Sequence, residues 1–183
     1  MFALHPEGKK VRVRIMFDES PEDFGLERVQ QGGKKVMFWG AISSLGKVYF
    51  DIIPDSIDSK VYCDFLKDKA LPAIRKMYQY SFIYQHDGAP AHHAASTATF
   101  LKKEKVEVLD WPAQSPDLNP IEQVWLWMDN KVKIKSFNNI EVLTQYVFDL
   151  WEELPENTIL SYIEKLKSKF SYVYENNGEL YAE

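Results

Sequence analysis

The sequence lacks the residues that a disulfide framework or a thiolate metal cluster requires. Cys63 is the only cysteine among 183 residues, so this chain can form no internal disulfide and no zinc site built from several cysteines. A long uncharged apolar run is also absent, and residues 1–7 do not have the basic and then apolar pattern of a secretory signal. We therefore expect a soluble protein that is neither secreted nor inserted in a membrane.

A basic excess is absent as well. The formal net charge is −5, which argues against a protein that holds nucleic acid by bulk electrostatics alone. Basic residues nevertheless gather at positions 9–14, 34–35, 102–105 and 131–135, and each group is either a solvated face or a phosphate contact. The 45% of apolar residues fits one globular domain with its own core.

Local patterns predict strands and helices in an order typical of an α/β fold. Five segments rich in β-forming residues and five with helical spacing of apolar residues occur along the chain. The strands are expected at 11–17, 36–42, 47–53, 80–85 and 106–109, and the helices at 59–77, 94–103, 121–133, 139–152 and 157–173. A hairpin signal lies at residues 43–46, and Pro72 is expected to kink the first helix. The later alternation indicates parallel strands with helices on both faces of a mixed sheet.

Two carboxylates lie where predicted elements join. Asp87 follows the strand expected at 80–85, and Glu122 lies in the first turn of the helix that Asn119 would cap, with 34 residues between the two acids. Ordinary turn and capping preferences can explain both positions. Carboxylates from separate elements can equally bind a hard cation such as Mg²⁺, and two such ions catalyse phosphodiester cleavage. Both interpretations are open on the residues alone.

Two segments resemble the catalytic domain of mariner-superfamily DDE transposases. They are residues 85–92, around Asp87, and the proline-rich residues 111–122, which end at Glu122. Residues 36–43 are similar to a strand that these proteins carry upstream. The resemblance implies an RNase H-like fold, here a mixed five-stranded sheet with helices on both faces and extra C-terminal helices.

The resemblance also implies a chemistry and a set of partners. In this family three acids bind Mg²⁺ or Mn²⁺, and the enzymes nick DNA at transposon ends and join the freed 3′-hydroxyl to a target. Asp87 matches the second acid and Glu122 the third. Transposon-end and target DNA are the implied partners, a homodimer is compatible with the family, and a eukaryotic copy would act in the nucleus. We expect residues 1–183 to form a single catalytic domain without the helix-turn-helix domains of the relatives.

The first acid of the family has two candidate positions. In one register residues 15–20 match the phrase around that acid, which makes Asp18 the first catalytic and metal-binding acid. In the other register residues 4–14 match the hairpin that follows the acid, and the acid then lies upstream of this sequence. Alternating arginines within residues 11–14 suit an exposed hairpin better than a central strand. A fold without its central strand, however, would be hard to form.

For other residues in and near these two segments, structural roles compete with functional ones. His92 either contacts phosphate, orients the site or starts a helix, and the His92–His93 pair lacks the spacing of a zinc site. Trp125 is expected to pack its helix rather than stack on bases. Asp117 and Asp129 are expected to be structural, with Asp129 on the surface side of its helix.

Three functions are therefore in competition. The leading one is a DDE-type transposase domain that performs metal-dependent DNA strand cleavage and strand transfer, in an active or a decayed copy. The second is a non-catalytic DNA- or protein-interaction module on the same fold, which the acidic net charge favours. The third is a structure-selective nuclease.

Overall fold

The computed structural model describes residues 2–3, 35–54, 56–78, 82–111 and 118–176. The strand predicted at 11–17, together with Asp18 and Asp117, lies outside these residues. The elements along the chain are β1 (Phe2–Ala3), β2 (Lys35–Ser43), β3 (Gly46–Ile53), α1 (Ser59–Phe65), η2 (Leu66–Ala70), α2 (Leu71–Met77), β4 (Ile83–Tyr84), α3 (Pro90–His93), α4 (Ala95–Lys103), β5 (Glu107–Val108), α5 (Pro120–Lys133), α6 (Ile140–Glu153) and α7 (Glu156–Glu175).

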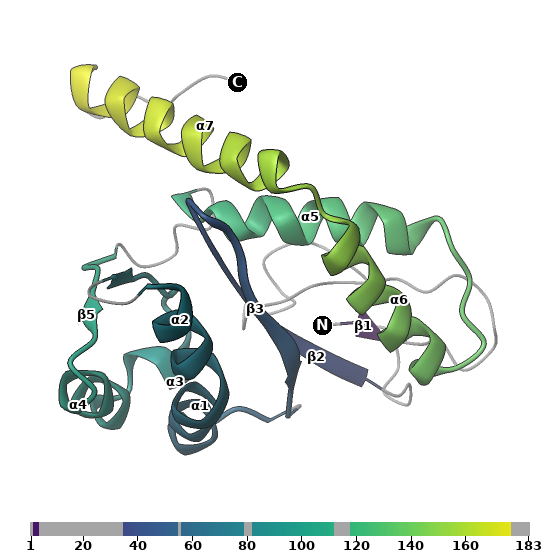
Figure 1. Ribbon diagram of the computed structural model, residues 1–183, viewed down its shortest axis with the longest axis horizontal. Coiled ribbons are helices and arrows are strands. Elements are labelled where there is room, and N and C mark those ends of the chain that lie inside the picture. Colours follow the sequence, from purple (N-terminus) through teal and green to yellow (C-terminus); the bar gives the residue numbers. More distant parts are fainter. Residues whose placement is uncertain (1, 4–34, 55, 79–81, 112–117, 177–183) are drawn as a thin grey trace.

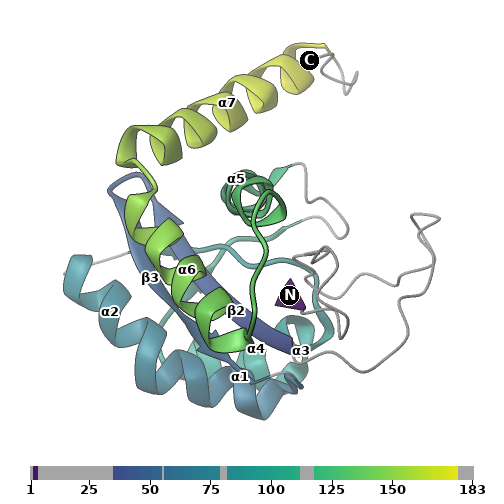
Figure 2. The same cartoon turned by 90° about the vertical axis from the view of Figure 1, so that its right-hand side faces the viewer.

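The β2–β3 hairpin lies between two hydrophobic cores. Successive side chains of a strand point to opposite faces of the sheet. On one face Val36 and Phe38 pack with α5, α6 and the start of α7. On the other face Trp39 and Ile53 pack with α1, α2 and α4. Helices therefore cover both faces of the hairpin, as predicted, and Figures 1 and 2 show the hairpin between these two groups of helices.

The strands form two small sheets. β1, β2 and β3 are antiparallel neighbours, and β4 pairs in parallel with β5. The predicted hairpin is confirmed, with Gly46 at φ +102°, a backbone conformation that favours glycine. The parallel pair joined through α4 is confirmed too. In the described part of the chain no strand joins β2 to β4, so the five-stranded sheet is not seen there.

The helix predicted at 59–77 contains a π-helical segment. The Asp58 side chain caps α1 by accepting a hydrogen bond from the Val61 N–H at 2.8 Å. The π-helical segment η2 ends two residues before Pro72, and the Leu71 N–H bonds to the Leu66 carbonyl. Because proline has no N–H, it cannot continue the regular ladder, and the irregularity lies where the sequence indicates it. None of the described helices has both the length and the apolar character that crossing a bilayer demands.

Trp125 docks α5 onto the hairpin. Its side chain is almost completely buried, and it lies so close to β2 that a Cβ atom at Gly40 would meet the indole Cη2 at 2.7 Å. Glycine at this position therefore permits the approach of α5. The indole also contacts the rings of Phe50 and Trp151, at centroid distances of 6.1 and 6.4 Å. The predicted packing role of Trp125 is confirmed, and this contact sets how closely α5 packs against β2.

Lys47 ties the hairpin to the end of α6. Its Nζ donates hydrogen bonds to the carbonyls of Trp151 at 3.1 Å and Glu152 at 2.7 Å. The last carbonyls of a helix have no partner within the helix, and a cation there also meets the negative end of the helix dipole. The lysine thus holds α6 against the turn of the hairpin.

The prediction that Asp129 lies on the surface is wrong. Asp129 is only 7% exposed and forms an ion pair with Lys133, one helical turn further along α5. It lies next to Met128 and one turn after Trp125, both of which are buried. The buried face of α5 is therefore wider than the apolar spacing alone indicates, because the helix packs under the hairpin and α6 together.

We predict that Gly40→Ala lowers the free energy of unfolding by about 1–3 kcal/mol, because the added methyl group collides with a buried ring. Trp125→Phe removes the ring atoms that the methyl group would meet. In a double-mutant cycle measured by chemical denaturation, the two changes should couple by about 0.5–3 kcal/mol, with the double variant losing less than the sum. Strictly additive losses would contradict the contact.

Candidate functional site

Asp87 lies just beyond the carboxyl end of β4. Ligands of α/β sheets gather at the carboxyl ends of parallel strands, and β4 is parallel to β5. The Asp87 Oδ1 accepts hydrogen bonds from the Ala89 N–H at 3.1 Å and from His92 Nδ1 at 2.5 Å. An ionised carboxylate only accepts, so Nδ1 carries the proton. Two donors therefore meet on one oxygen.

These contacts keep Asp87 ionised at neutral pH. Burial opposes ionisation of the carboxyl group, but the hydrogen bond and charge of His92, together with the Ala89 N–H, hold the pKa of Asp87 below its ordinary value of 3.8. For His86, burial and then the nearby His92 lower the pKa to about 4, although Asp87 acts in the opposite direction. At neutral pH an aspartate anion thus lies beside an uncharged His86 ring.

Two buried tyrosines, Tyr62 and Tyr84, pack against the histidines that lie beside Asp87. The hydroxyl groups of Tyr62 and Tyr84 are 2.8 Å apart and hydrogen-bonded, and the Tyr62 hydroxyl is 3.4 Å from His86 Nδ1. The Tyr62 ring lies 4.1 Å from the His92 ring. Burial raises the pKa of both tyrosines, so both remain uncharged. The sequence contains no signal for this role, because both residues occupy ordinary core positions of a helix and a strand.

α5 brings Glu122 to the same region of the molecule. Asn119 is the N-cap and accepts a hydrogen bond from the Ile121 N–H at 3.3 Å, and Pro120 is the first helical residue. The predicted helix start is therefore confirmed. Asp87 and residues 119–121 line one cavity of about 400 Å³. The chain thus brings Asp87 and the start of α5, which carries Glu122, together across 34 intervening residues.

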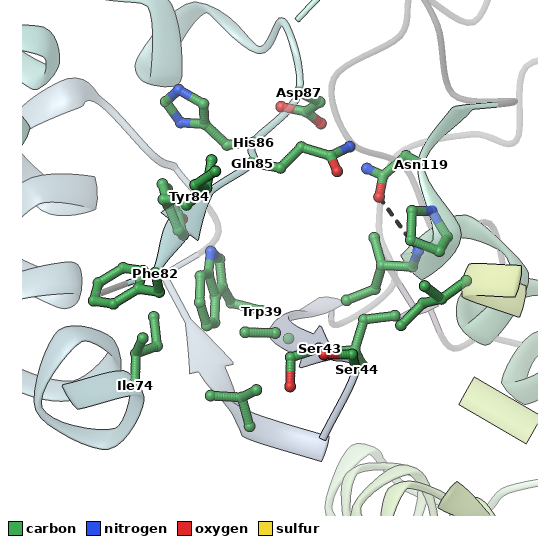
Figure 3. Close-up of a pocket in the computed structure, with 18 of the residues that line it drawn as sticks. Trp39, Ser43, Ser44, Ile74, Phe82, Tyr84, Gln85, His86, Asp87 and Asn119 are labelled. Atoms are coloured by element: carbon green, nitrogen blue, oxygen red, sulfur yellow. Dashed lines mark hydrogen bonds between the residues drawn. The ribbon is translucent and has the colours of Figure 1, made fainter. Parts of the chain in front are cut away.

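The cavity lies between the β2–β3 hairpin and the end of β4. β2 contributes Trp39 and the residues up to the turn, and the chain from Phe82 to Asp87 forms the opposite wall. Figure 3 shows the side chain of Gln85, the residue that follows β4, extending toward Asn119. Its Nε2 is buried and has no hydrogen-bond partner among the described residues.

Of the other candidate residues, the structure describes His92 but not Asp18 or Asp117. His92 lies in α3 and contacts Asp87 directly, so it combines the predicted helix position with an orienting contact. Asp18 and Asp117 lie outside the described residues. Within the described ranges no group of three histidine, cysteine or acidic side chains could hold a metal ion. A complete three-acid site therefore needs a residue from outside these ranges.

The available oxygens suit a hard divalent cation. Mg²⁺ and its analogues prefer carboxylate oxygens and retain several water ligands, so one or two carboxylates are enough to bind them. Asp87 is ionised at neutral pH, and its Oδ2 has no hydrogen-bond donor among the described residues. Glu122 supplies a second carboxylate from the first turn of α5. The side chains present therefore fit Mg²⁺ or Mn²⁺.

We predict that the His86 ring, followed by NMR, titrates with a midpoint near pH 4. Its pKa in the unfolded chain is near 6.5, so between pH 6.5 and pH 4 the unfolded state binds the proton more tightly. The contribution of His86 to stability is therefore complete above that window and is lost as the pH falls through it. His86→Gln should flatten the pH dependence of stability in this window, and a midpoint near 6.5 would contradict the burial argument.

Comparison with known proteins identifies the family. Residues 13–144 match the model of a family described as DDE superfamily endonuclease. Over 166 residues the chain is 30% identical to the Tcb2 transposase of Caenorhabditis briggsae, and this match covers 91% of the chain and 60% of the relative. The chain thus spans little more than half the length of that transposase.

Solved structures of the Mos1 mariner transposase of Drosophila mauritiana share the fold. The Mos1 catalytic domain superposes with a TM-score of 0.72 at 21% identity and covers 81% of this chain and 77% of that one. The Mos1 paired-end complex with Mn gives a TM-score of 0.74 at 22% identity, over 90% of this chain and 52% of that one. The mixed helix and strand architecture is therefore the RNase H-like fold, and the chain belongs to the DDE superfamily endonuclease family, with Tc1 and mariner transposases among its relatives.

Proposed function

We propose that residues 1–183 form the catalytic domain of a transposase that cleaves DNA strands and transfers their 3′ ends with the help of Mg²⁺ or Mn²⁺. One observation carries this proposal. In a chain of the DDE family, Asp87 and the residues immediately before Glu122 line one cavity. Ordinary turn and capping roles do not require the two segments to meet.

Asp87 and Glu122 would hold the cation, each from a different element. Divalent ions in such a site activate the attacking oxygen and stabilise the leaving oxygen of a phosphodiester. Asp87 contributes an ionised carboxylate, since His92 and Ala89 stabilise its charge. Glu122 lies in the first turn of α5, where the helix dipole favours a negative charge. His86 is uncharged at neutral pH, so it does not compete with a cation for Asp87.

The inferred partners follow from the relatives. Mos1 has been solved as a paired-end complex with a transposon end and as a strand transfer complex. We infer that this chain also acts on transposon-end and target DNA, as a homodimer, and in the nucleus when it is expressed in a eukaryote. The helix-turn-helix domains expected in such relatives are not part of the domain proposed for residues 1–183.

We also propose that a central strand completes a five-stranded sheet by lying between β2 and β4. Residues of both strands line the cavity from opposite sides. Gln85 Nε2 is buried in its wall without an acceptor among the described residues, and the carbonyl of an added strand would supply one. Such a strand would also pair with the edge of β2 that, beyond Val36, has no strand partner in the described ranges.

The position of β1 bears on the first acid. β1 pairs antiparallel with the start of β2, with Phe2 opposite Val36. Because this pairing is antiparallel, a strand that continued it toward the cavity would run back from Phe2 and face the residues of β2 after Val36. That is the edge of β2 along which the central strand is proposed. It supports the register in which residues 4–14 are the hairpin that follows the first acid, rather than the register in which Asp18 is that acid.

We predict that Mn²⁺ binds the parent chain in isothermal titration and that Asp87→Ala and Glu122→Ala each weaken binding by at least about tenfold, since even loss of an outer-shell partner costs 10- to 100-fold. The exposed Asp64 on α1 provides a matched control, and Asp64→Ala should bind as the parent does. If Mn²⁺ does not bind, or binds equally to all variants, the catalytic proposal fails and the non-catalytic interaction module takes its place. Cleavage of branched DNA without transposon ends would favour the structure-selective nuclease instead.

We predict that Asp18→Asn leaves the Mn²⁺ affinity unchanged, because the register of β1 supports a first acid in another position. The measurement is the same titration, with Asp87→Asn as the variant of matched chemistry. A loss with Asp18→Asn as large as the loss with Asp87→Asn would assign Asp18 as the first acid.

A further inference from the structure

The hydrogen bonds of Asp87 are unevenly distributed over its two oxygens. Both donors, the Ala89 N–H and His92 Nδ1, meet Oδ1. Oδ2 has no donor among the described residues, although the side chain is 27% exposed. A carboxylate held in this way has one oxygen already engaged and one available to a ligand.

His92 is itself held in place by its neighbours, so the position of its Nδ1 donor is fixed. Its side chain is only 7% exposed, and its ring packs against the rings of both Tyr62, at 4.1 Å, and His86, at 5.1 Å. The backbone of α3 is fixed as well, because the Thr97 hydroxyl donates to the Ala91 carbonyl at 2.6 Å. The imidazole therefore cannot follow the carboxylate if the carboxylate turns.

We propose that His92 is a positioning residue of the metal site, which holds Oδ1 of Asp87 so that Oδ2 alone coordinates the cation. The inference rests on the proposed function, because it assumes that Asp87 is a metal ligand. Partners that fix the orientation of a ligating carboxylate reduce the reorganisation that metal binding requires. A cation bound through Oδ2 leaves both hydrogen bonds of Oδ1 intact, whereas a bidentate cation would compete with them.

The test compares two replacements that remove the ring but differ in hydrogen bonding. Leucine at position 92 has no donor, whereas the side-chain amide of asparagine can take the place of Nδ1. In isothermal titration of the full chain with Mn²⁺, we expect His92→Leu to bind about 10- to 100-fold more weakly than the parent. We expect His92→Asn to recover most of that affinity. His93→Ala is the matched control, because His93 is exposed and has no hydrogen bond to Asp87.

The outcomes separate this inference from the proposed function. Thermal melting first establishes that each variant is folded. If Asp87→Ala abolishes Mn²⁺ binding but His92→Leu binds as the parent does, the proposed function stands and the role of His92 is refuted. Equal losses in His92→Leu and His92→Asn would also refute it, because packing of the ring would then matter rather than its donor. In crystals with Mn²⁺ the ion should contact Oδ2 only, and bidentate coordination would overturn the inference.

Discussion

The contact between Trp125 and Gly40 is the constraint on which the position of the site depends. The buried indole of Trp125 occupies the space that a side chain at position 40 would fill. This contact lets α5 approach the hairpin closely and fixes the distance between them. Because α5 is one continuous helix, the packing of Trp125 also fixes the position of its first turn. The start of α5 therefore lies across the cavity from the end of β4, and packing between elements far apart in the sequence places it there.

The second element of the site is electrostatic and local. Asp87 is partly buried, which by itself would favour the neutral acid. Its hydrogen bonds reverse this preference, and they come from residues only two and five positions along the chain. A short loop followed by one helical turn therefore creates a stable anion at the carboxyl end of β4. Uncharged neighbours, His86 and the Tyr62–Tyr84 pair, surround it without neutralising it.

Sequence reasoning succeeded where local chemistry decides the outcome. The hairpin turn follows from a glycine with positive φ, and the start of α5 follows from Asn119 as a cap and Pro120 as the first helical residue. The same reasoning failed for Asp129, whose burial depends on what packs over α5. It also missed the support that Tyr62 gives to the site, because an apolar helix position looks the same whether it faces plain core or a buried hydroxyl pair.

The residues alone were enough to propose Asp87 and Glu122 as candidate acids, to predict the order of the strands and helices that the structure describes, and to show a resemblance to one family of DNA-processing enzymes. These conclusions depend on short patterns of spacing, capping and turn chemistry, which act within a few residues. Only the tertiary structure decided that Asp87 and the start of α5 share a cavity and that His92 engages Oδ1 and not Oδ2. Such facts depend on which surfaces come together, and packing between elements far apart in sequence leaves no trace in a local pattern.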